Sequence, residues 1–327
     1  MELITLTMPI YNVEGYVERA LLSALNQTYK NIEYLIVDDK GSDKSMDIVR
    51  NIISTHPRGE YVRIIEHPVN LGLGAARNSA IDAAKGKYLY FMDSDDEITS
   101  DCIQKLYEKM TETDVDVICG TYSQIGGTVI SHSETKDVIA KNKEQVMLNY
   151  LNGKFPVTVW NKLYKTSFIR INNIRCVPHQ TIEDNYFTFQ IVINAQSYSI
   201  ISEITYFYHI RNGSVTNGGV WSENIYIQWS KIFKDQLSAL NASSLDFVLR
   251  RKIKKKLFWT RIGVSERALK SPHNVQHYIN DYLSSSFLKD KDTLFSGILL
   301  LASGISQMPL AVKKVFLLIH MKLYNTN

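Results

Sequence analysis

Residues 3–42 read LITLTMPIYNVEGYVERALLSALNQTYKNIEYLIVDDKGS, and this stretch decides the fold class. It contains two apolar runs of strand length, residues 3–8 and 32–37. Between them, residues 16–25 carry apolar side chains at helical spacing. The stretch therefore predicts a buried strand, an amphipathic helix and a second buried strand.

The same alternation continues further along the chain. It predicts helices at residues 45–53, 74–84 and 101–110 and strands at residues 62–66, 88–92 and 115–119. Strands that alternate with helices in this way are typical of a mostly parallel sheet flanked by helices, whose ligands bind beyond the carboxyl ends of the strands. We therefore predict a Rossmann-like α/β fold and expect functional residues directly after its strands.

Composition and charge exclude several classes of protein. Of the 327 residues, 45% are hydrophobic, which indicates a globular chain, and the net charge of +4 is too balanced for a nucleic-acid-binding surface. Cys102, Cys119 and Cys176 are an odd number and lack the CxxC spacing of a zinc site. Because the chain has no signal-like start and no apolar run of about 20 residues, we expect a cytoplasmic protein.

The sharpest motif follows the predicted strand at residues 88–92. Asp93, Ser94, Asp95 and Asp96 come directly after it. Two carboxylates two positions apart at a strand end can converge on one divalent cation, which in turn neutralises a diphosphate. Acidic residues after strands also serve as solvated turns or helix caps, so the motif alone leaves both interpretations open.

Two further polar segments lie where ligands bind in such folds. Asp39 follows the predicted strand at residues 32–37, where a carboxylate can bind a nucleobase or a ribose hydroxyl; a turn leading to a helix cap is the alternative. Residues 70–78, NLGLGAARN, place small residues at a helix start and Arg77 one turn inside it. Arg77 can contact a phosphate or Asp93 there, and a loop with a surface arginine is the alternative.

The order of these segments resembles the family 2 inverting glycosyltransferases, which have the GT-A fold. The resemblance spans roughly residues 1–215 and rests on MPIYN at 8–12, NQTY at 26–29, VDDKGS at 37–42, NLGLGAARN at 70–78 and FMDSDD at 91–96. It implies a metal-dependent enzyme that moves a hexosyl or hexosaminyl group from a nucleotide sugar to a saccharide hydroxyl. The donor is usually a UDP-sugar.

The resemblance also assigns roles at the donor site. Asp39 would read the base, Arg77 would lie near the diphosphate, and Asp95 with Asp93 would bind Mn²⁺ or Mg²⁺ between the two phosphates. His209, in the segment YFYHIR at residues 206–211, is a further candidate metal ligand, with a structural role as the alternative. The nucleotide-sugar-binding residues expected from the resemblance are Pro9, Tyr11, Asp39, Arg77, Asp93 and Ser94.

The acceptor side is expected around two later segments. TIEDNYF at residues 181–187 resembles the family's acidic pair before a helix, in which Asp184 would be the general base; otherwise both acids only favour the helix dipole. An aromatic ring followed by two hydrogen-bonding side chains at residues 160–162 could position a sugar, and core packing of the ring is the alternative. The candidates for sugar or acceptor binding are Trp160, Asn161, Lys162 and Glu183.

One position departs from the family pattern. Lys40 stands between Asp39 and Gly41, where glycine more usually follows the two aspartates directly. The change alters the turn and leaves Asp39 in place.

The C-terminal third lies beyond the resemblance. We expect a catalytic GT-A domain at residues 1–218 and a helical C-terminal extension at residues 219–327. The basic run at 250–256 and the apolar segment at 294–324 fit peripheral contact with anionic lipid on the inner face of the membrane, with a lipid-linked saccharide as acceptor. They fit equally a helical subdomain that packs on the catalytic domain or in a homodimer.

Two other functions fit the sequence less well than glycosyl transfer. No GxGxxG follows the first strand, which argues against a nucleotide-binding oxidoreductase. A non-catalytic protein that binds a nucleotide sugar or scaffolds a polysaccharide assembly system is the remaining alternative. The joint presence of Asp39, Asp93, Asp95 and Asp184 favours an enzyme, which we expect to act in cell-surface polysaccharide or glycan assembly.

Overall fold

The computed structural model describes residues 1–126, 136–210, 221–283, 305 and 307–324. The chain divides into two compact units, Met1–Ser214 and Val215–Asn327. The domain boundary expected between residues 218 and 219 lies outside the described residues.

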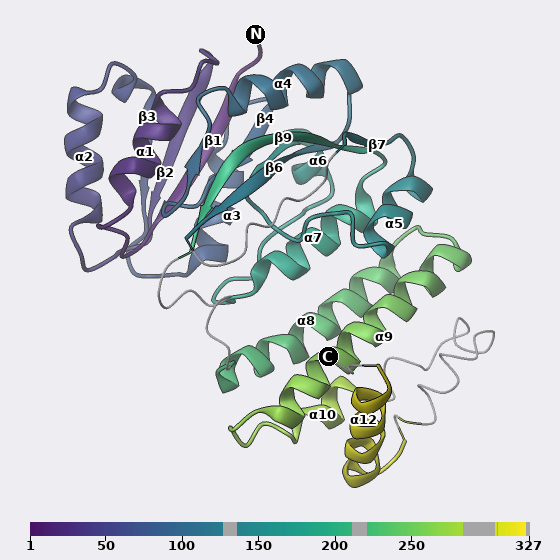
Figure 1. The fold of residues 1–327 in the computed structure, drawn as a ribbon. Coiled ribbons are helices and arrows are strands. Elements are labelled where there is room, and N and C mark those ends of the chain that lie inside the picture. Colours follow the sequence, from purple (N-terminus) through teal and green to yellow (C-terminus); the bar gives the residue numbers. More distant parts are fainter. Residues whose placement is uncertain (127–135, 211–220, 284–304, 306, 325–327) are drawn as a thin grey trace. The chain divides into compact units, whose positions relative to one another are not determined.

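In the first unit, the described residues form a nine-stranded sheet in the order β3-β2-β1-β4-β8-β6-β9-β5, with β7 beside β9 (Figure 1). Its first four strands are parallel neighbours whose register brings their carboxyl ends to one edge. They are β1 (Ile4–Ile10), β2 (Ile32–Asp38), β3 (Val62–Glu66) and β4 (Tyr88–Phe91).

The rest of the sheet is mixed. The long strands β6 (Val117–Ile125) and β9 (Tyr198–His209) pair in parallel, whereas the shorter strands pair antiparallel. The shorter strands are β5 (Glu97–Ile98), β7 (Val138–Ala140) and β8 (Lys162–Lys165), and β8 joins the two parallel parts. The longest pairings are thus parallel, and the predicted mainly parallel α/β sheet is confirmed.

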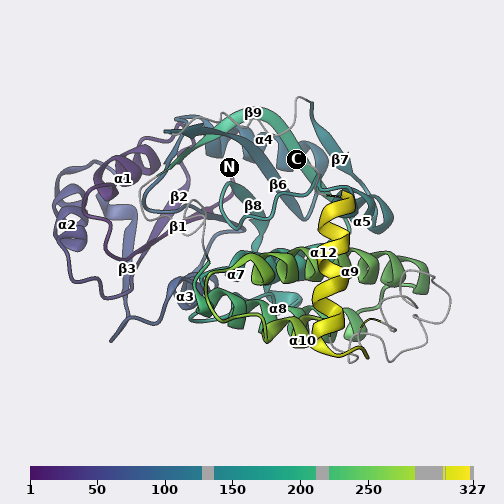
Figure 2. The same cartoon turned by 60° about the horizontal axis from the view of Figure 1, so that its bottom comes forward.

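The alternation of side chains along β2 explains the layers. Tyr34 and Ile36 pack into the core shared with α1 (Val17–Leu25), α2 (Ser45–Thr55) and α4 (Cys102–Thr113). Leu35 and Val37 point to the opposite face and pack against α3 (Leu73–Ala83). Figure 2 shows α1 and α4 on one side of the sheet and α3 and α7 on the other. The remaining elements of this unit are η1 (Gly59–Tyr61), α5 (Lys143–Leu151), α6 (Thr166–Ile171) and α7 (Glu183–Asn194).

The second unit is helical in its described residues, as expected for the C-terminal extension. It contains α8 (Glu223–Ala242), α9 (Phe247–Lys270), α10 (Tyr278–Tyr282) and α12 (Leu310–Tyr324). Arg261 of α9 is buried and donates to the backbone oxygens of Phe233 and Tyr282, which ties α8, α9 and α10 together.

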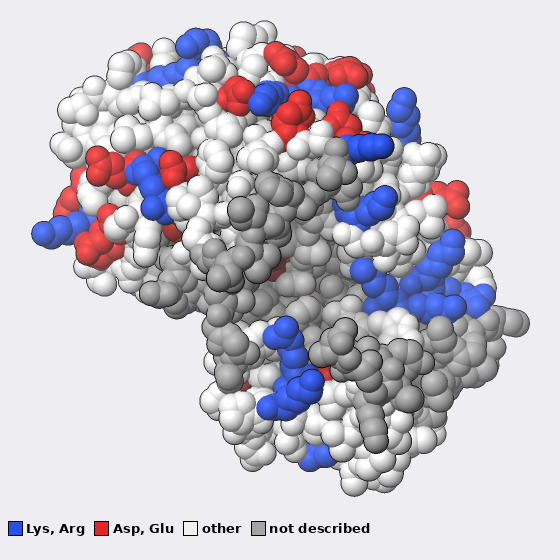
Figure 3. Space-filling model, in the orientation of Figure 1, with Lys and Arg blue, Asp and Glu red and all other residues white. Residues whose placement is uncertain are grey.

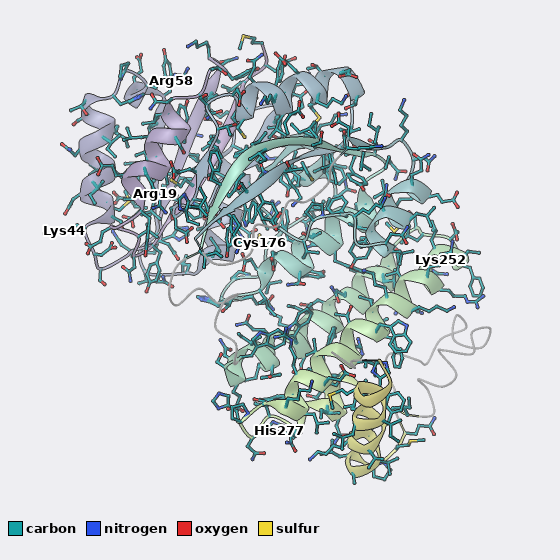
Figure 4. All side chains as sticks on the ribbon, viewed as in Figure 1. Arg19, Lys44, Arg58, Cys176, Lys252 and His277 are labelled. Carbon is teal, nitrogen blue, oxygen red and sulfur yellow. The ribbon has the colours of Figure 1, made fainter. Side chains whose placement is uncertain are left out.

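The basic run predicted from the sequence lies on α9. Figure 3 shows lysine and arginine side chains gathered on the surface over this helix, and Lys252 is labelled there in Figure 4. Of the apolar segment at 294–324, residues 294–304 and 306 lie outside the described residues. Within the described ranges, no helix combines the length and apolar character that crossing a membrane requires.

Candidate active site

Polar side chains gather where the parallel strands end. Tyr11, Asp39, His67 and Asp93 are the residues that directly follow β1, β2, β3 and the apolar β4–Met92 segment. Because those strands run in the same direction, these residues lie along one edge of the sheet. Polar residues therefore line the carboxyl edge of the parallel strands, where the sequence predicted that a ligand binds.

A buried arginine links two acidic segments at this edge. Arg77 projects from α3, is 2% exposed, and its Nη2 lies 2.7 Å from Oδ1 of Asp93. Its Nη1 donates to Oε1 of Glu183, the first residue of α7. The sequence predicted that Arg77 contacts either a phosphate or Asp93, and the structure shows the pair with Asp93. Arg77 also pairs with Glu183, which lies 106 positions further along the chain.

The pKa values follow from this burial. Burial raises the pKa of Glu183 to about 7, Arg77 opposes that rise, and the neighbouring carboxylates of Asp184 and Asp93 add to it. Burial alone would lower the pKa of Arg77, but the two carboxylates raise it above its usual value. Arg77 is therefore a permanent cation, whereas the pKa of Glu183 lies near neutral pH.

Asp184 occupies the first turn of α7. Burial raises the pKa of its carboxyl, while the charges of Arg77 and Lys162 and hydrogen bonds from Asn185 lower it. The helix itself is held by Phe187, whose ring packs edge-on against Phe91 of β4 and Tyr164 of β8. This packing places the acidic pair beside the end of β4.

Lys162 is a buried cation within this group. Its Nζ donates to the backbone oxygen and to Oγ1 of Thr158, the latter at 2.6 Å. Burial lowers the pKa of Lys162 to about 8, and Cys119 and Asp184 oppose that shift. These contacts hold Lys162 within the protein and do not test whether it binds an acceptor, so its assignment to the acceptor site stays a prediction.

The turn after β4 is anchored by its last aspartate. Asp96 accepts hydrogen bonds from the Tyr206 hydroxyl at 2.7 Å and from the backbone N–H of His209 at 2.8 Å, both on β9. Burial and repulsion from Asp95 and Asp93 raise the pKa of Asp96 to about 8. Asp96 is therefore an anchor for the turn rather than the helix cap weighed from the sequence, since α4 begins after Asp101.

Asp93 and Asp95 are the part-buried carboxylates of the same turn. Mg²⁺ is usually held by one or two carboxylates together with substrate phosphates, and hard oxygen donors suit Mn²⁺ as well. The repulsion that raises the pKa of the adjacent Asp96 is the kind of charge accumulation that a cation relieves. The donor set thus fits the expected metal, although the described residues contain no group of three or more His, Cys, Asp or Glu side chains placed to hold a metal ion.

The position of the turn is also controlled from α1. Arg19 (Figure 4) donates from Nη2 to the backbone oxygen of Asp95 at 2.7 Å, and its Nε lies 3.7 Å from Oε1 of Glu97. His209 shares that carboxylate, because its Nε2 lies 2.7 Å from Glu97 Oε1. His209 therefore contacts the turn through Glu97, and its assignment as a metal ligand stays a prediction.

Asp39 organises the loop before α3. Its carboxylate accepts from the backbone N–H groups of Leu71 and Gly72, at 2.8 and 2.9 Å, and lies 2.7 Å from Nδ1 of His67. His67 reaches Ser79 of α3 with its other ring nitrogen, at 2.9 Å. Asp39 is 2% exposed, so its protein partners use most of its capacity as an acceptor, and base recognition by its side chain stays a prediction.

The other residues expected at the donor site lie at the ends of β1 and β4 and differ in their exposure to solvent. Pro9 is buried within β1, Tyr11 is 49% exposed directly after it, and Ser94 is buried in the turn after β4. Lys40, where the family usually has glycine, adopts a left-handed backbone with φ of 56°, and its N–H donates to Oδ1 of Asp38. The lysine thus takes the conformation that glycine adopts without cost.

The side chains of Trp160 and Asn161 pack against neighbouring strands of the sheet. The Trp160 ring stacks on Tyr206 and Tyr208, with ring centroids 4.5 and 5.7 Å apart. Asn161 is buried and bridges Thr121 and Thr205 through its side chain. These contacts match the packing alternative for Trp160, and sugar binding by either residue stays a prediction.

Several residues of the site carry no motif of their own. His67, Arg19 and Gln180 appear only once the fold brings distant segments together. For His67, the one available signal is its position directly after a strand of the parallel sheet. The others lie in helices, strands or loops whose local sequence is unremarkable for a ligand site.

Comparison with known proteins gives a consistent result. The model of the family described as Glycosyl transferase family 2 matches residues 5–170. An uncharacterized glycosyltransferase of Haemophilus influenzae is 30% identical over 239 residues, which cover 71% of this chain and 90% of the relative. The poly(ribitol-phosphate) beta-glucosyltransferase of Bacillus spizizenii is 33% identical over 258 residues, 77% of this chain.

Some relatives are much longer than this chain. The match covers 38% of the Bacillus spizizenii enzyme and 34% of glycosyltransferase GlyA of Streptococcus pneumoniae. Among solved structures, TarS 1–349 from S. aureus in complex with UDP has a TM-score of 0.75 at 19% identity, with 98% of this chain and 92% of that chain covered. The same TarS fragment with UDP-GlcNAc has a TM-score of 0.72 at 21% identity, covering 88% and 81%. At this identity the likeness establishes the fold.

Proposed function

The chain belongs to glycosyl transferase family 2 and has the GT-A fold, and from this premise we propose that it transfers a sugar from a UDP-sugar to a saccharide hydroxyl with inversion at the anomeric carbon. The observation that carries the proposal is the Asp93–Arg77–Glu183 ion-pair chain, which is centred on the buried Arg77. It joins the turn expected to hold the diphosphate to the acidic pair expected to activate the acceptor.

The donor is proposed to bind along the edge formed by the ends of the parallel strands. Pro9, Tyr11 and the loop held by Asp39 line the nucleoside end, and Ser94, Asp93 and Arg77 lie at the diphosphate end. TarS, which shares the fold, binds UDP and UDP-GlcNAc, and this supports a uridine nucleotide here.

The diphosphate end is proposed to need a divalent cation. Asp95 and Asp93 would hold Mn²⁺ or Mg²⁺, which would neutralise the departing diphosphate as a Lewis acid. Arg77, whose charge is permanent, keeps Asp93 in place from the opposite side. Arg19 fixes the backbone of the turn at Asp95.

The acceptor side uses the first turn of α7. We assign Asp184 as the general base that removes the proton from the acceptor hydroxyl as this attacks the anomeric carbon. Glu183 is paired with Arg77 and is assigned the role of orienting this turn. The acceptor itself is proposed to be a glycan or polyol-phosphate polymer of the cell surface, because the relatives include poly(ribitol-phosphate) glycosyltransferases.

Catalysis is assigned to residues 1–218, with residues 219–327 as a helical extension. The extension is proposed either to contact a membrane or to pack as a helical subdomain, on the catalytic domain or in a homodimer.

Calorimetric titration of UDP, with and without Mn²⁺, tests the proposal. The wild-type protein is expected to bind UDP more tightly with the metal, and the double variant Asp93→Asn, Asp95→Asn is expected to lose that gain. Equal binding with and without metal would remove the assigned metal site. Absence of UDP binding would favour a different nucleotide or the non-catalytic scaffold role.

The stereochemistry has its own test. NMR of the product formed from an α-linked UDP-sugar is expected to show a β linkage. A product that retains the α configuration would contradict the single displacement assigned to Asp184.

A further inference from the structure

Gln180 is a buried polar side chain without a hydrogen-bond partner. It is 6% exposed, and neither its Nε2 nor its Oε1 is bonded in the structure. Among the residues that the structure describes, no other buried side-chain amide leaves both its nitrogen and its oxygen unpaired. Buried amides are almost always paired, so this position requires an explanation.

The chain on either side places Gln180 at the candidate active site. On one side, a Cβ built on Gly72 would lie 3.3 Å from the backbone nitrogen of His179, so this residue touches the start of α3. On the other side, Glu183 is paired with Arg77, one turn into α3. Gln180 is the next residue after the first contact and three residues before the second, so it lies alongside the first turns of α3.

The preceding residues hold this segment firmly. Asn78 donates to the Cys176 oxygen at 2.8 Å and accepts from its N–H at 2.9 Å (Cys176 is labelled in Figure 4). A Cβ on Gly74 would lie 2.4 Å from the backbone oxygen of Val177, so helix and segment are in direct contact. The segment is thus fixed to α3, and the missing partners of Gln180 are not the result of a loose surface loop.

The chemistry of the amide narrows its ligand. A primary amide offers two N–H donors and one carbonyl acceptor. A phosphate offers only acceptors and would leave Oε1 unpaired. Two neighbouring hydroxyl groups of a sugar match the amide, since one can donate to Oε1 while the other accepts from Nε2. The nearby cation Arg77 is already paired with Asp93 and Glu183, which also favours a neutral ligand over an anion.

We propose that Gln180 binds a pair of carbohydrate hydroxyls and so contributes to sugar specificity. This inference rests on the proposed function, because it assumes that a sugar enters the site. The hydroxyls belong either to the sugar of the donor or to the acceptor, and the experiment separates the two sources.

The test is the variant Gln180→Met, which keeps the length of the side chain and removes both polar groups. UDP, UDP-glucose and UDP-GlcNAc are titrated by calorimetry, and transfer to p-nitrophenyl glycosides of glucose and GlcNAc is measured. If the donor sugar is the ligand, the variant binds the preferred UDP-sugar about tenfold more weakly, while its affinity for UDP is unchanged. If the acceptor is the ligand, the acceptor KM rises about tenfold instead.

Thermal stability supplies a signature that a purely structural role of the amide would not give. Gln180→Met removes an unpaired buried amide, so its Tm is expected to rise by about 2–4 °C while sugar binding weakens. Gln190→Met is the matched control. The Gln190 amide is bonded to Arg175 and Tyr186, so this variant is expected to lose stability and keep its sugar affinity.

Two failures are distinguishable. If the wild type binds UDP and Gln180→Met changes neither UDP-sugar binding nor acceptor KM, the inference about Gln180 is wrong and the proposed function stands. If the wild type binds no uridine nucleotide, the proposed function fails, and the inference falls with it.

Discussion

The surroundings of Asp184 shift the pKa of its carboxyl in opposite directions. Burial favours its neutral form, whereas Arg77 and Lys162 favour the ionised form that a general base needs. Asp184→Asn keeps the size of the side chain and removes its basicity. We expect kcat to fall by about 10²–10⁴-fold while the Kd of UDP stays the same, because the donor end is untouched.

Steady-state kinetics and calorimetry on the same preparation check this expectation. Asp82→Asn is the control, since Asp82 is an exposed partner of Arg175 on the far end of α3. A variant at Asp184 that retains the wild-type kcat would assign the base to another group.

The pH profile of transfer depends on the same carboxyl. A base acts only when ionised, so activity is lost as the pH falls through the pKa of Asp184, and burial places that pKa above the usual range for aspartate. The charge of Lys162 lowers this pKa. Lys162→Met is therefore expected to raise it and to move the acidic limb of the kcat profile to higher pH.

The kcat profiles of wild type and Lys162→Met, recorded from about pH 5 to 9, decide this point. Burial puts the pKa of Lys162 itself at about 8, so the two profiles should differ most below that pH. An acidic limb that stays in place, or moves to lower pH, would show that Lys162 does not act on the base.

At the scale of helices and strands, local periodicity predicted most elements of the first unit up to β6, whereas the later elements, including the long strand β9, had no periodicity-based prediction. The strands β1 to β4 and the helices between them lie within a few residues of the predicted positions, because each apolar run carries its own signal. The short antiparallel strands β5, β7 and β8 were not predicted. A strand of two to four residues is defined by its partners rather than by its own sequence.

The same distinction applies to the candidate site. Asp93 and Arg77 lie next to predicted elements, and their pairing was one of two expected contacts. The pairing of Arg77 with Glu183, and the contacts of His67 and Arg19, join segments that no local pattern relates. The unpaired amide of Gln180 likewise becomes visible only when its surroundings are known.

Two helix glycines allow a test of the packing between α3 and the segment before α7. A Cβ at Gly74 would meet the backbone oxygen of Val177 at 2.4 Å, so Gly74→Ala is expected to destabilise the protein by about 1–3 kcal/mol. Alanine is nevertheless the better helix former by about 1 kcal/mol. The clash should also weaken UDP binding, because α3 carries Arg77.

Gly263→Ala in α9 is the matched control, because nothing lies within 4 Å of a Cβ there. It is expected to stabilise the protein by up to about 1 kcal/mol. Chemical denaturation of both variants supplies the measurement. A Gly74→Ala protein as stable as the control would contradict the close contact between helix and segment.

For the whole molecule, the division into two units has a thermodynamic consequence. The residues assigned to the donor site all lie in Met1–Ser214, so only this unit should gain stability from the ligand. At a ligand concentration a hundredfold above Kd, the gain is about 2.7 kcal/mol. For a unit of this size, that gain corresponds to roughly 5–10 °C in Tm.

Differential scanning calorimetry with and without UDP and Mn²⁺ makes the comparison. We expect one transition to move upward and a second, from the helical unit, to stay in place. Arg261→Met should lower the second transition and leave the first unchanged, since Arg261 ties α8, α9 and α10 together. A single transition that moves as a whole would show that the two units unfold together.

The buried chain from Asp93 through Arg77 to Glu183 also constrains how this protein can evolve. Removing Arg77 leaves the buried carboxylate of Glu183 without its cation, and breaking a buried ion pair in this way typically costs about 3–5 kcal/mol. A loss of that size approaches the total stability of many domains. Substitution of Arg77 is therefore expected to be tolerated only together with a change at Glu183 or after stabilising substitutions elsewhere, although the two positions lie 106 residues apart.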